Sequence, residues 1–357
     1  MDIKITKIEE AGLDAWNEYV LNSPDSNIYQ LSGWKNVIEN AYGHQTYYLV
    51  AVDNNDMKIK GILPMVHLKH FLFGNSLISM PYFDMGGILA DNETISEELL
   101  KEAIQIGKHV GVNEVELRYA QHVNGLGKSV HFDSDFIKLK NDKVRMLLEL
   151  PDSSDNLMKS FKSKLRSQIK KPIKEGLEYE IGGIELLDEF YTVFLVNMRD
   201  LGSPVHSKKL LKHMLQEFSK STRIVLVRKD GIPLAGSVIS GYREILENPW
   251  ASSLRKYGHL SPNMLLYWAM LEYGCDHGFK YFDFGRSTPG EGTYHFKKQW
   301  GAEPELLQWY YYSFTSKPEE QGISEKSKFE KLIGYWQKLP VSVTRVIGPV
   351  IRKHIGL

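Results

Sequence analysis

The stretch YFDFGRSTPGEGTYHFKKQWGAEP, residues 281–304, holds the densest set of residues that could do chemistry. Asp283 and Arg286 flank the end of a short apolar run that we expect to be a buried strand, and α/β sheets bind ligands at such strand ends. The glycines that follow would let a ligand approach the backbone closely. Lys297 and Lys298 then fall in the first turn of a helix or in a tight loop, so cations and backbone N–H groups could bind a phosphate or a developing oxyanion.

The same stretch lacks the motifs of nucleotide-hydrolysing and dinucleotide-binding proteins. It contains no G-x-x-x-x-G-K-[ST] loop, and its glycines do not have the dinucleotide spacing. An ion pair between Asp283 and Arg286 that only holds the loop is the structural alternative, and the pattern leaves it open.

Polar side chains set among aromatic and apolar ones are candidates for acceptor binding, because such groups tend to line clefts. In the second half of the chain these candidates are Arg199, Trp250, Ser252, Asn263 and Tyr267. Arg199 suits a carboxylate or phosphate, with an ion pair to Asp200 as the alternative. Asn263 shares a helical face with Tyr267 but could instead cap that helix.

In the first half of the chain, the run MPYFDMGG places Tyr82 and Asp84 on a loop bounded by glycines. Asp84 is a candidate general base, and an aspartate that forms a turn is the simpler interpretation.

A basic run extends from Lys159 to Lys174 with seven Lys or Arg and no acidic residue. It could seat a phosphate-bearing substrate through residues such as Lys164 and Arg166, or it could be a solvated helix face.

The remaining residue types argue against metal or thiol chemistry. The 12 histidines show no metal-ligand spacing, so we predict no catalytic metal. Cys275, the only cysteine, lies in an apolar helix end and is expected to be a core thiol.

Composition limits the class of protein. Lys plus Arg and Asp plus Glu are equal at 44 each, so there is no global field that favours nucleic acid or anionic lipid. The N-terminal residues lack the features of a secretory signal, and no apolar run reaches the length of a membrane span. We therefore expect a soluble cytoplasmic protein whose contact with the membrane, if any, is peripheral.

The elements needed to position these residues form two α/β domains. Strand-like runs at 46–52, 59–68 and 114–119 alternate with helical runs in residues 1–150. In residues 151–315 the same order of helices, hairpin, helix and strand recurs, with helices at 186–201, 207–219 and 263–274 and strands at 223–228, 234–242 and 281–284. We expect two diverged copies of one α/β unit.

The tail, residues 316–357, is basic and amphipathic. Phe329, Leu332, Ile333 and Trp336 are expected to share one helical face and to dock the tail on the first domain. An interfacial membrane anchor is the alternative.

The run FKKQWG, residues 296–301, resembles the FK-x-x-aromatic-Gly motif near the end of the second GNAT domain in Fem aminoacyltransferases, and Lys297 matches its lysine. The run KSKLRSQIKKPIKEGLEYEIGG, residues 162–183, resembles the stretch that opens the same domain. Longer runs, such as GILPMVHLKHFLFGNSLISMPYFDMGG and FYTVFLVNMRDLGSPVHSKK, extend the resemblance over nearly the whole chain to Fem-like proteins associated with exosortase and exopolysaccharide systems. The resemblance implies an α/β (α+β) fold of two tandem GNAT-like domains with mixed sheets, and amide-bond formation in envelope assembly.

Acyl transfer to an amine requires a neutral nucleophile, a group that takes its proton, and donors for the tetrahedral oxyanion. We expect Lys297 to stabilise the oxyanion or the donor phosphate, Asp283 and Arg286 to shape the loop beneath it, and no cofactor to be bound. The chain lacks the inserted helical arm of some tRNA-dependent relatives, so aminoacyl-tRNA, acyl-CoA and an acyl carrier protein all stay open as donors. The expected acceptor is an envelope or polysaccharide precursor.

Two other functions fit the same sequence. One is a catalytically inert GNAT-like scaffold in polysaccharide assembly, and the other is a small-molecule acyl-CoA N-acyltransferase.

Overall fold

The computed structural model describes residues 2–71, 73–120, 137–314 and 332–356 and divides into two compact units. Unit 1 comprises Met1–Val144, Glu305–Glu320 and His354–Leu357, and unit 2 comprises Arg145–Pro304 and Gln321–Lys353. Contacts therefore place the first boundary a few residues before the expected residue 150. They also return residues 305–313 to unit 1, because β14 (Glu303–Ser313) pairs antiparallel with β6 (Glu114–Ala120) along most of its length.

Unit 1 is built on a mixed sheet. Its other strands are β1 (Ile3–Lys7), β2 (Thr46–Asp53), β3 (Ile59–His70), β4 (Gly74–Ile78), β5 (Leu89–Ala90) and β7 (Ile137–Lys140). The strand order is β1-β2-β3-β4-β6-β14, with β5 paired to β3 and β7 to β14. Neighbours are antiparallel except β4 and β6, which run parallel. The helices are α1 (Ile8–Ala11), α2 (Leu13–Asn22), η1 (Ile28–Gln30), α3 (Gly33–Tyr42) and α4 (Glu93–Val110).

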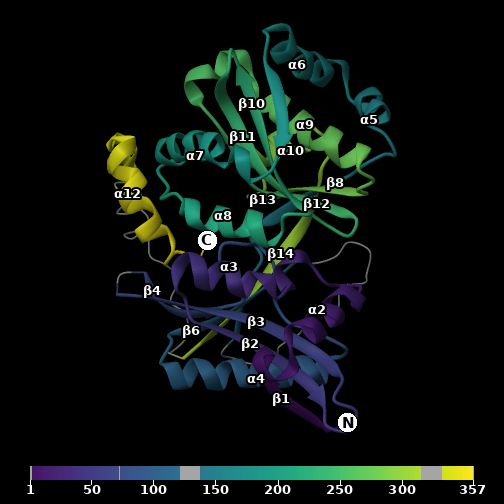
Figure 1. Cartoon of the computed structure of the whole chain (residues 1–357), viewed down its shortest axis with the longest axis vertical. Coiled ribbons are helices and arrows are strands. Elements are labelled where there is room, and N and C mark those ends of the chain that lie inside the picture. Colours follow the sequence, from purple (N-terminus) through teal and green to yellow (C-terminus); the bar gives the residue numbers. More distant parts are fainter. Residues whose placement is uncertain (1, 72, 121–136, 315–331, 357) are drawn as a thin grey trace. The chain divides into compact units, whose positions relative to one another are not determined.

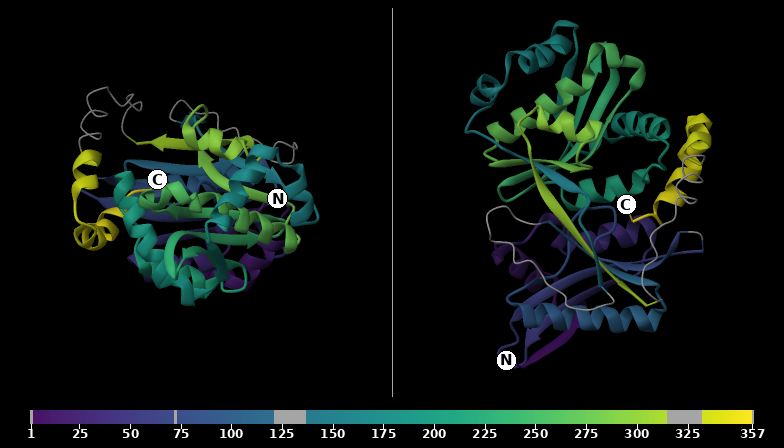
Figure 2. Two further views of the ribbon diagram at one scale, coloured as in Figure 1. Left: turned by 90° about the horizontal axis from the view of Figure 1, so that it is seen from above. Right: turned by 180° about the vertical axis from the view of Figure 1, so that it is seen from behind.

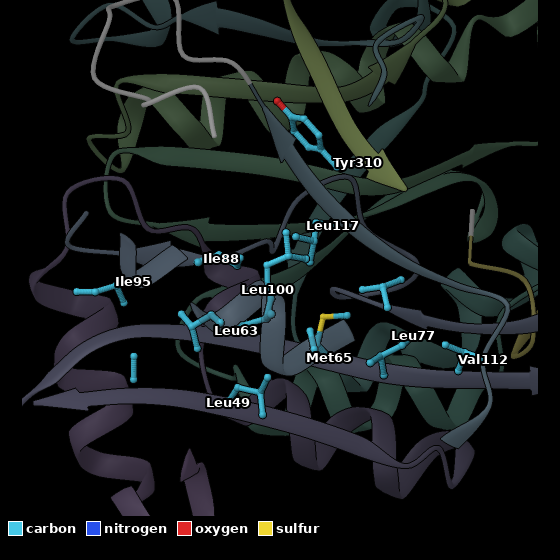
Figure 3. Close-up of a cluster of buried hydrophobic side chains, with 14 residues drawn as sticks. Leu49, Leu63, Met65, Leu77, Ile88, Ile95, Leu100, Val112, Leu117 and Tyr310 are labelled. Carbon is cyan, nitrogen blue, oxygen red and sulfur yellow. The ribbon is translucent and has the colours of Figure 1, made fainter. Parts of the chain in front are cut away.

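Helix α4 supplies one side of the unit 1 core. The Asn92 side chain caps its start by accepting from the Ile95 N–H at 3.1 Å, and Gly111 ends it in a left-handed conformation. Leu99 and Ala103, one turn apart, are fully buried against β2, β3 and β6. Figure 3 shows part of this cluster, in which Leu49, Leu63 and Leu117 from the three strands meet α4.

Unit 2 repeats the α/β plan. Its strands are β8 (Val144–Glu149), β9 (Glu178–Gly182), β10 (Thr222–Lys229), β11 (Ile232–Tyr242), β12 (Ile245–Ser253) and β13 (Tyr281–Ser287). Its helices are α5 (Ser154–Ser160), α6 (Ser163–Lys174), η2 (Ile184–Leu186), α7 (Leu187–Leu201), α8 (Lys208–Glu217), η3 (Arg255–Leu260), α9 (Pro262–Asp276), α10 (Gly292–Lys298) and α12 (Val341–Arg352). The strand order is β8-β13-β12-β11-β10-β9.

Helices cover both faces of the unit 2 sheet. Figure 1 shows α7 on one side of β11 and α9 on the other, and both helices contact this strand. Helix α9 is apolar on nearly every face, and most of its residues are buried. It packs beneath α5 and α6 as well as on the sheet, so this helix forms the centre of the unit.

The end of the chain differs from the expected docking on the first domain. Helix α12, drawn in yellow, contacts α7 of unit 2 (Figure 1, Figure 2), and only His354–Leu357 belongs to unit 1. Residues 332–338 are helical. Ile333 touches Gly202 and Trp336 touches Gly348, whereas Leu332 is 63% exposed, so the expected shared face is split; Phe329 lies outside the described residues. No helix in the described part of the chain is long and apolar enough to cross a membrane.

Candidate active site

The parallel strands β12 and β13 pair over three residues and then separate. Ile245, Leu246 and Glu247 pair with Tyr281, Phe282 and Asp283. Beyond this point β12 continues to Ser253 alongside β11, and β13 continues to Ser287. Alternate backbone groups of β12 therefore face an edge where the neighbouring strand no longer pairs with them. Such an edge can hydrogen-bond an extended ligand.

A bulge in β12 coincides with the separation. Val238 of β11 pairs with Trp250 and Ser240 pairs with Glu247, so Ile239 alone opposes Asn248 and Pro249. The hydroxyl of the buried Ser237 can donate its one proton to Asn248 Oδ1, 3.1 Å away, or to the Trp250 carbonyl oxygen, 3.0 Å away. Either contact holds the bulge in place.

Strand β13 turns away at Gly285, whose φ is +74°. A side chain is strained in this left-handed conformation, which glycine adopts freely. The Gly285 N–H donates to Asp283 Oδ1 at 2.7 Å, and Asp283 Oδ2 lies 3.5 Å from Arg145 Nη1. Asp283 and Arg145 are both buried, so this ion pair anchors the turn from within the unit. Asp283 thus pairs with Arg145 of β8, which the sequence did not single out.

Lys297 stabilises the turn at Gly285 through its side chain. Its side chain is only 7% exposed, and Nζ donates to the carbonyls of Gly285 at 2.9 Å and Arg286 at 2.8 Å. Lys297 lies in the last turn of α10, not in a first turn or a tight loop as expected, and the segment after β13 folds back across the strand end to bring it there. Its neighbour Lys298 points elsewhere and binds Glu303. The predicted residues Asp283, Arg286 and Lys297 therefore do meet, around Gly285.

Tyr267 joins this group through an aromatic cluster. Its ring stacks on Phe284 with centroids 5.5 Å apart and meets Phe296 at 5.0 Å and Trp300 at 6.2 Å. Burial raises the pKa of Tyr267 to about 12, so the phenol is neutral at physiological pH. Asn263, one turn earlier, does not cap α9, because Ser261 is the N-cap residue.

The other predicted residues of unit 2 have structural partners. Arg199 donates to Asp200 Oδ1 at 2.6 Å and to the Leu339 carbonyl at 3.1 Å, which is the alternative considered from the sequence. Ser252 is buried on β12, where its hydroxyl accepts from Asn197 of α7 at 3.1 Å. Trp250 is half-buried, with its ring centroid 5.4 Å from that of His206.

Tyr82 and Asp84 belong to unit 1. The Tyr82 N–H donates to the Gly356 carbonyl at 2.7 Å, and Tyr82 has a positive φ of 78°. The backbone carbonyl of Asp84 accepts from Trp309 Nε1 at 3.1 Å. Within unit 1 both residues therefore help to hold a tight loop.

A pocket of about 740 Å³ lies in unit 2 between α5, the start of α6 and the turn after α10. Lys162, Lys164 and Trp300 are among its lining residues, and Glu149 adds one negative charge. The first intrahelical bond of α6 is from the Arg166 N–H to the Lys162 carbonyl, and no side chain caps the helix, so its first N–H groups are open to a ligand.

Two further features concern the polar groups around this pocket. Arg166 donates to the carbonyls of Lys159 and Phe161, which would otherwise repel negative charge. Trp300 is buried in the pocket wall, and its Nε1–H has no hydrogen-bond acceptor among the described residues. Lys164 thus lines the pocket, whereas Arg166 hydrogen-bonds the backbone beside it.

Sequence reasoning missed three buried polar residues of the site, Arg145, Ser237 and Asn248. Each lies in a strand, and nothing in its local sequence distinguishes it from a residue that pairs in a sheet. Across the described ranges, no group of three or more His, Cys, Asp or Glu could hold a metal ion.

Comparison with protein families places this site in a known type of domain. Residues 159–298 match the family described as an acetyltransferase (GNAT) domain. The match runs from α5 to Lys298 and so includes the separated strands and Lys297. The matched part of the chain, residues 159–298, is therefore a GNAT-type acyltransferase domain. No curated protein matches the chain.

Solved structures with the same arrangement support the two-unit fold. FemX is 15% identical with a TM-score of 0.66, and the alignment covers 88% of this chain and 98% of that chain. L-PGS from Bacillus licheniformis is 14% identical with a TM-score of 0.54, covering 90% and 96%. A tandem GNAT protein from the clavulanic acid biosynthesis pathway is 10% identical with a TM-score of 0.53, covering 89% and 100%. The expected fold class, α/β with GNAT-like domains in tandem, is confirmed.

Proposed function

We propose that this protein forms an amide bond by transferring an aminoacyl or acyl group to an amine of a cell-envelope or exopolysaccharide precursor on the cytoplasmic side. The observation that carries the proposal is the separation of β12 from β13 within the GNAT domain, next to Gly285 and Lys297. The similarity of fold to FemX and the resemblance of FKKQWG to the Fem motif favour an aminoacyl donor. An association with exosortase systems rests on the sequence resemblance alone.

In this reaction the acceptor amine attacks the donor carbonyl, the new C–N bond forms, and the bond to the donor oxygen or sulfur breaks. The amine proton leaves with that oxygen or sulfur, through a base or through solvent. No covalent enzyme intermediate is required. The open edge of β12 would hold the donor, and the buried ammonium of Lys297 would supply positive charge near the strand ends for the developing oxyanion.

The lysine-lined pocket beside the FKKQWG turn is proposed to seat the phosphate of a substrate. The N-terminus of α6 and the exposed Lys162 and Lys164 together favour an anion over a neutral group. A nucleotide-linked or lipid-linked precursor and a tRNA all carry such a phosphate.

A scaffold without catalytic activity is the second candidate, and one observation favours it. Asp283 and Lys297, the charged residues at the strand ends, both have structural partners that account for their burial. A GNAT domain that has lost its chemistry could retain these contacts for stability alone.

A thermal-shift screen followed by a transfer assay distinguishes these candidates. Aminoacyl-tRNA, acetyl-CoA and nucleotide-linked or lipid-linked envelope precursors are added in turn, because a ligand bound only by the folded state raises the melting temperature. The melting temperature should rise with a donor and with a phosphate-bearing precursor, and amide product should form when both are present. Acetyl-CoA combined with a simple amine tests small-molecule acetylation.

A pair of variants ties the result to the pocket. Lys162→Ala with Lys164→Ala should raise at least tenfold the concentration of precursor needed for the same rise in melting temperature. The reason is that each charge-assisted hydrogen bond contributes about 1.5–3 kcal/mol. The matched control changes Lys170 and Lys174, two exposed lysines of α6 that do not line the pocket, and should bind normally. Ligand binding without product in any combination would favour the scaffold.

A further inference from the structure

Helix α12 packs with its polar and small residues inward and its apolar residues outward. Thr344, Gly348 and Arg352, spaced by four, form its buried side. Val343 is 39% exposed, Val346 68%, Ile347 36% and Val350 61%. These four residues have the spacing i, i+3, i+4 and i+7, so they form one continuous stripe, which we call the valine stripe.

The buried side explains why the helix does not turn its apolar face inward. A Cβ on Gly348 would lie 3.1 Å from Val205 Cγ1 and 3.2 Å from the Val205 backbone N, so glycine at this position allows α12 to approach the segment before α8 closely. Arg352 is buried at the other end of the same side, where its positive charge adds to the effect of burial in lowering the pKa of His206. The close backbone approach at Gly348 and the buried charge of Arg352 determine which side of α12 faces inward. The valine stripe therefore faces solvent.

The segment that carries the stripe has charge of one sign. Residues 332–356 contain two lysines and two arginines and no acidic residue. Arg345 of α12 is exposed, and so are Lys338, Leu332 at 63% and Tyr335 at 69% in the residues that precede α12. This concentration of apolar and cationic surface contrasts with the charge balance of the whole chain, where acidic and basic residues are equal in number.

We infer that the valine stripe of α12 binds the surface of a membrane that contains anionic lipids. An amphipathic helix with basic flanks lies in the lipid interface with its apolar residues among the acyl chains, and nearby Lys and Arg interact with anionic headgroups. A second copy of this chain fits less well, because residues 332–356 offer no acidic residue to pair with the cations of another copy. This inference does not depend on the proposed reaction.

Co-sedimentation of the full chain with vesicles tests the inference. The protein should sediment with an equal mixture of phosphatidylcholine and phosphatidylglycerol and much less with phosphatidylcholine alone. Val346→Asp with Val350→Asp should lower the partition coefficient at least tenfold. Arg345→Gln should lower it about fivefold, because one cation near an anionic surface contributes about 1 kcal/mol.

The matched control is Ile232→Asp with Ile173→Asp, which adds the same two negative charges at residues of unit 2 outside α12 that are each 52% exposed, and it should leave binding unchanged. All these positions are exposed, so the variants should fold, as an unchanged melting temperature would verify. The inference is overturned if wild-type protein ignores the anionic vesicles or if the stripe variant binds them normally. It is also overturned if sedimentation velocity shows a dimer that the stripe variant abolishes, which would assign the stripe to a second copy.

Discussion

Replacing Lys297 with methionine should destabilise unit 2 by about 3 kcal/mol. Methionine retains most of the aliphatic stem but cannot donate to the Gly285 and Arg286 carbonyls, which Nζ contacts at 2.9 and 2.8 Å. A hydrogen bond to a charged group contributes about 1.5–3 kcal/mol, so losing two would cost about 3–6 kcal/mol. Removing a buried ammonium relieves its desolvation, which favours the lower end of that range.

Thermal unfolding measures this effect. For a unit of this size about 3 kcal/mol corresponds to a decrease in melting temperature of roughly 9 °C. Lys298→Met is the matched control, because its ammonium forms a partly exposed ion pair with Glu303 and should contribute under about 1 kcal/mol. Equal melting temperatures for the Lys297 variant and the wild type would show that Lys297 does not hold the end of β13.

The transfer assay then separates stability from chemistry. At a temperature where the Lys297→Met protein stays folded, the proposed role in oxyanion stabilisation requires kcat to fall by about 100-fold or more. A lower melting temperature with unchanged kcat would leave Lys297 with a positioning role alone.

Two further predictions concern Gly285 and His206. Gly285→Ala should lower the free energy of unfolding by about 1–2 kcal/mol, because the φ of +74° at this position strains any side chain. Gly258→Ala is the control and should cost little, since Gly258 is exposed and no atom lies within 4 Å of the added Cβ. Equal denaturant midpoints for the two variants would contradict the first expectation. His206 is buried with its pKa well below 6.5, so only the unfolded state gains its proton as the pH falls through 6.5, and stability is lost on acidification. Between pH 7.5 and pH 5 the free energy of unfolding should fall by about 2 kcal/mol from this cause, and the His206→Gln variant should lack that part of the pH dependence. Denaturant unfolding at several pH values measures it, and an identical dependence of stability on pH in the two proteins would refute the prediction.

Elements with a strong local pattern were predicted well from the sequence. The predicted strand 46–52 is β2 (Thr46–Asp53) and the predicted helix 186–201 is α7 (Leu187–Leu201). Their apolar periodicity alone determines which face is buried. Strand β12 was missed because Glu247, Asn248 and Pro249 disfavour a strand locally, and only pairing with β11 and β13 makes it one.

The candidate site shows the same division. Asp283, Arg286 and Lys297 were chosen for their residue types and spacing, and they do gather around Gly285. Their partners could not be chosen in this way. Arg145 reaches Asp283 from a strand far away in the sequence, and Arg199 binds its neighbour Asp200.

The sequence by itself determined the α/β class, the position of the main helices and the residues that meet at the end of β13, since these follow from local periodicity and from motifs that are contiguous in the chain. Only the tertiary structure decided how β12 and β13 separate, that Lys297 is buried on two carbonyls, and that α12 turns its valines outward. Those features depend on contacts between distant segments, where close backbone approach at Gly348 and the buried charges of Arg145 and Arg352 outweigh the local pattern.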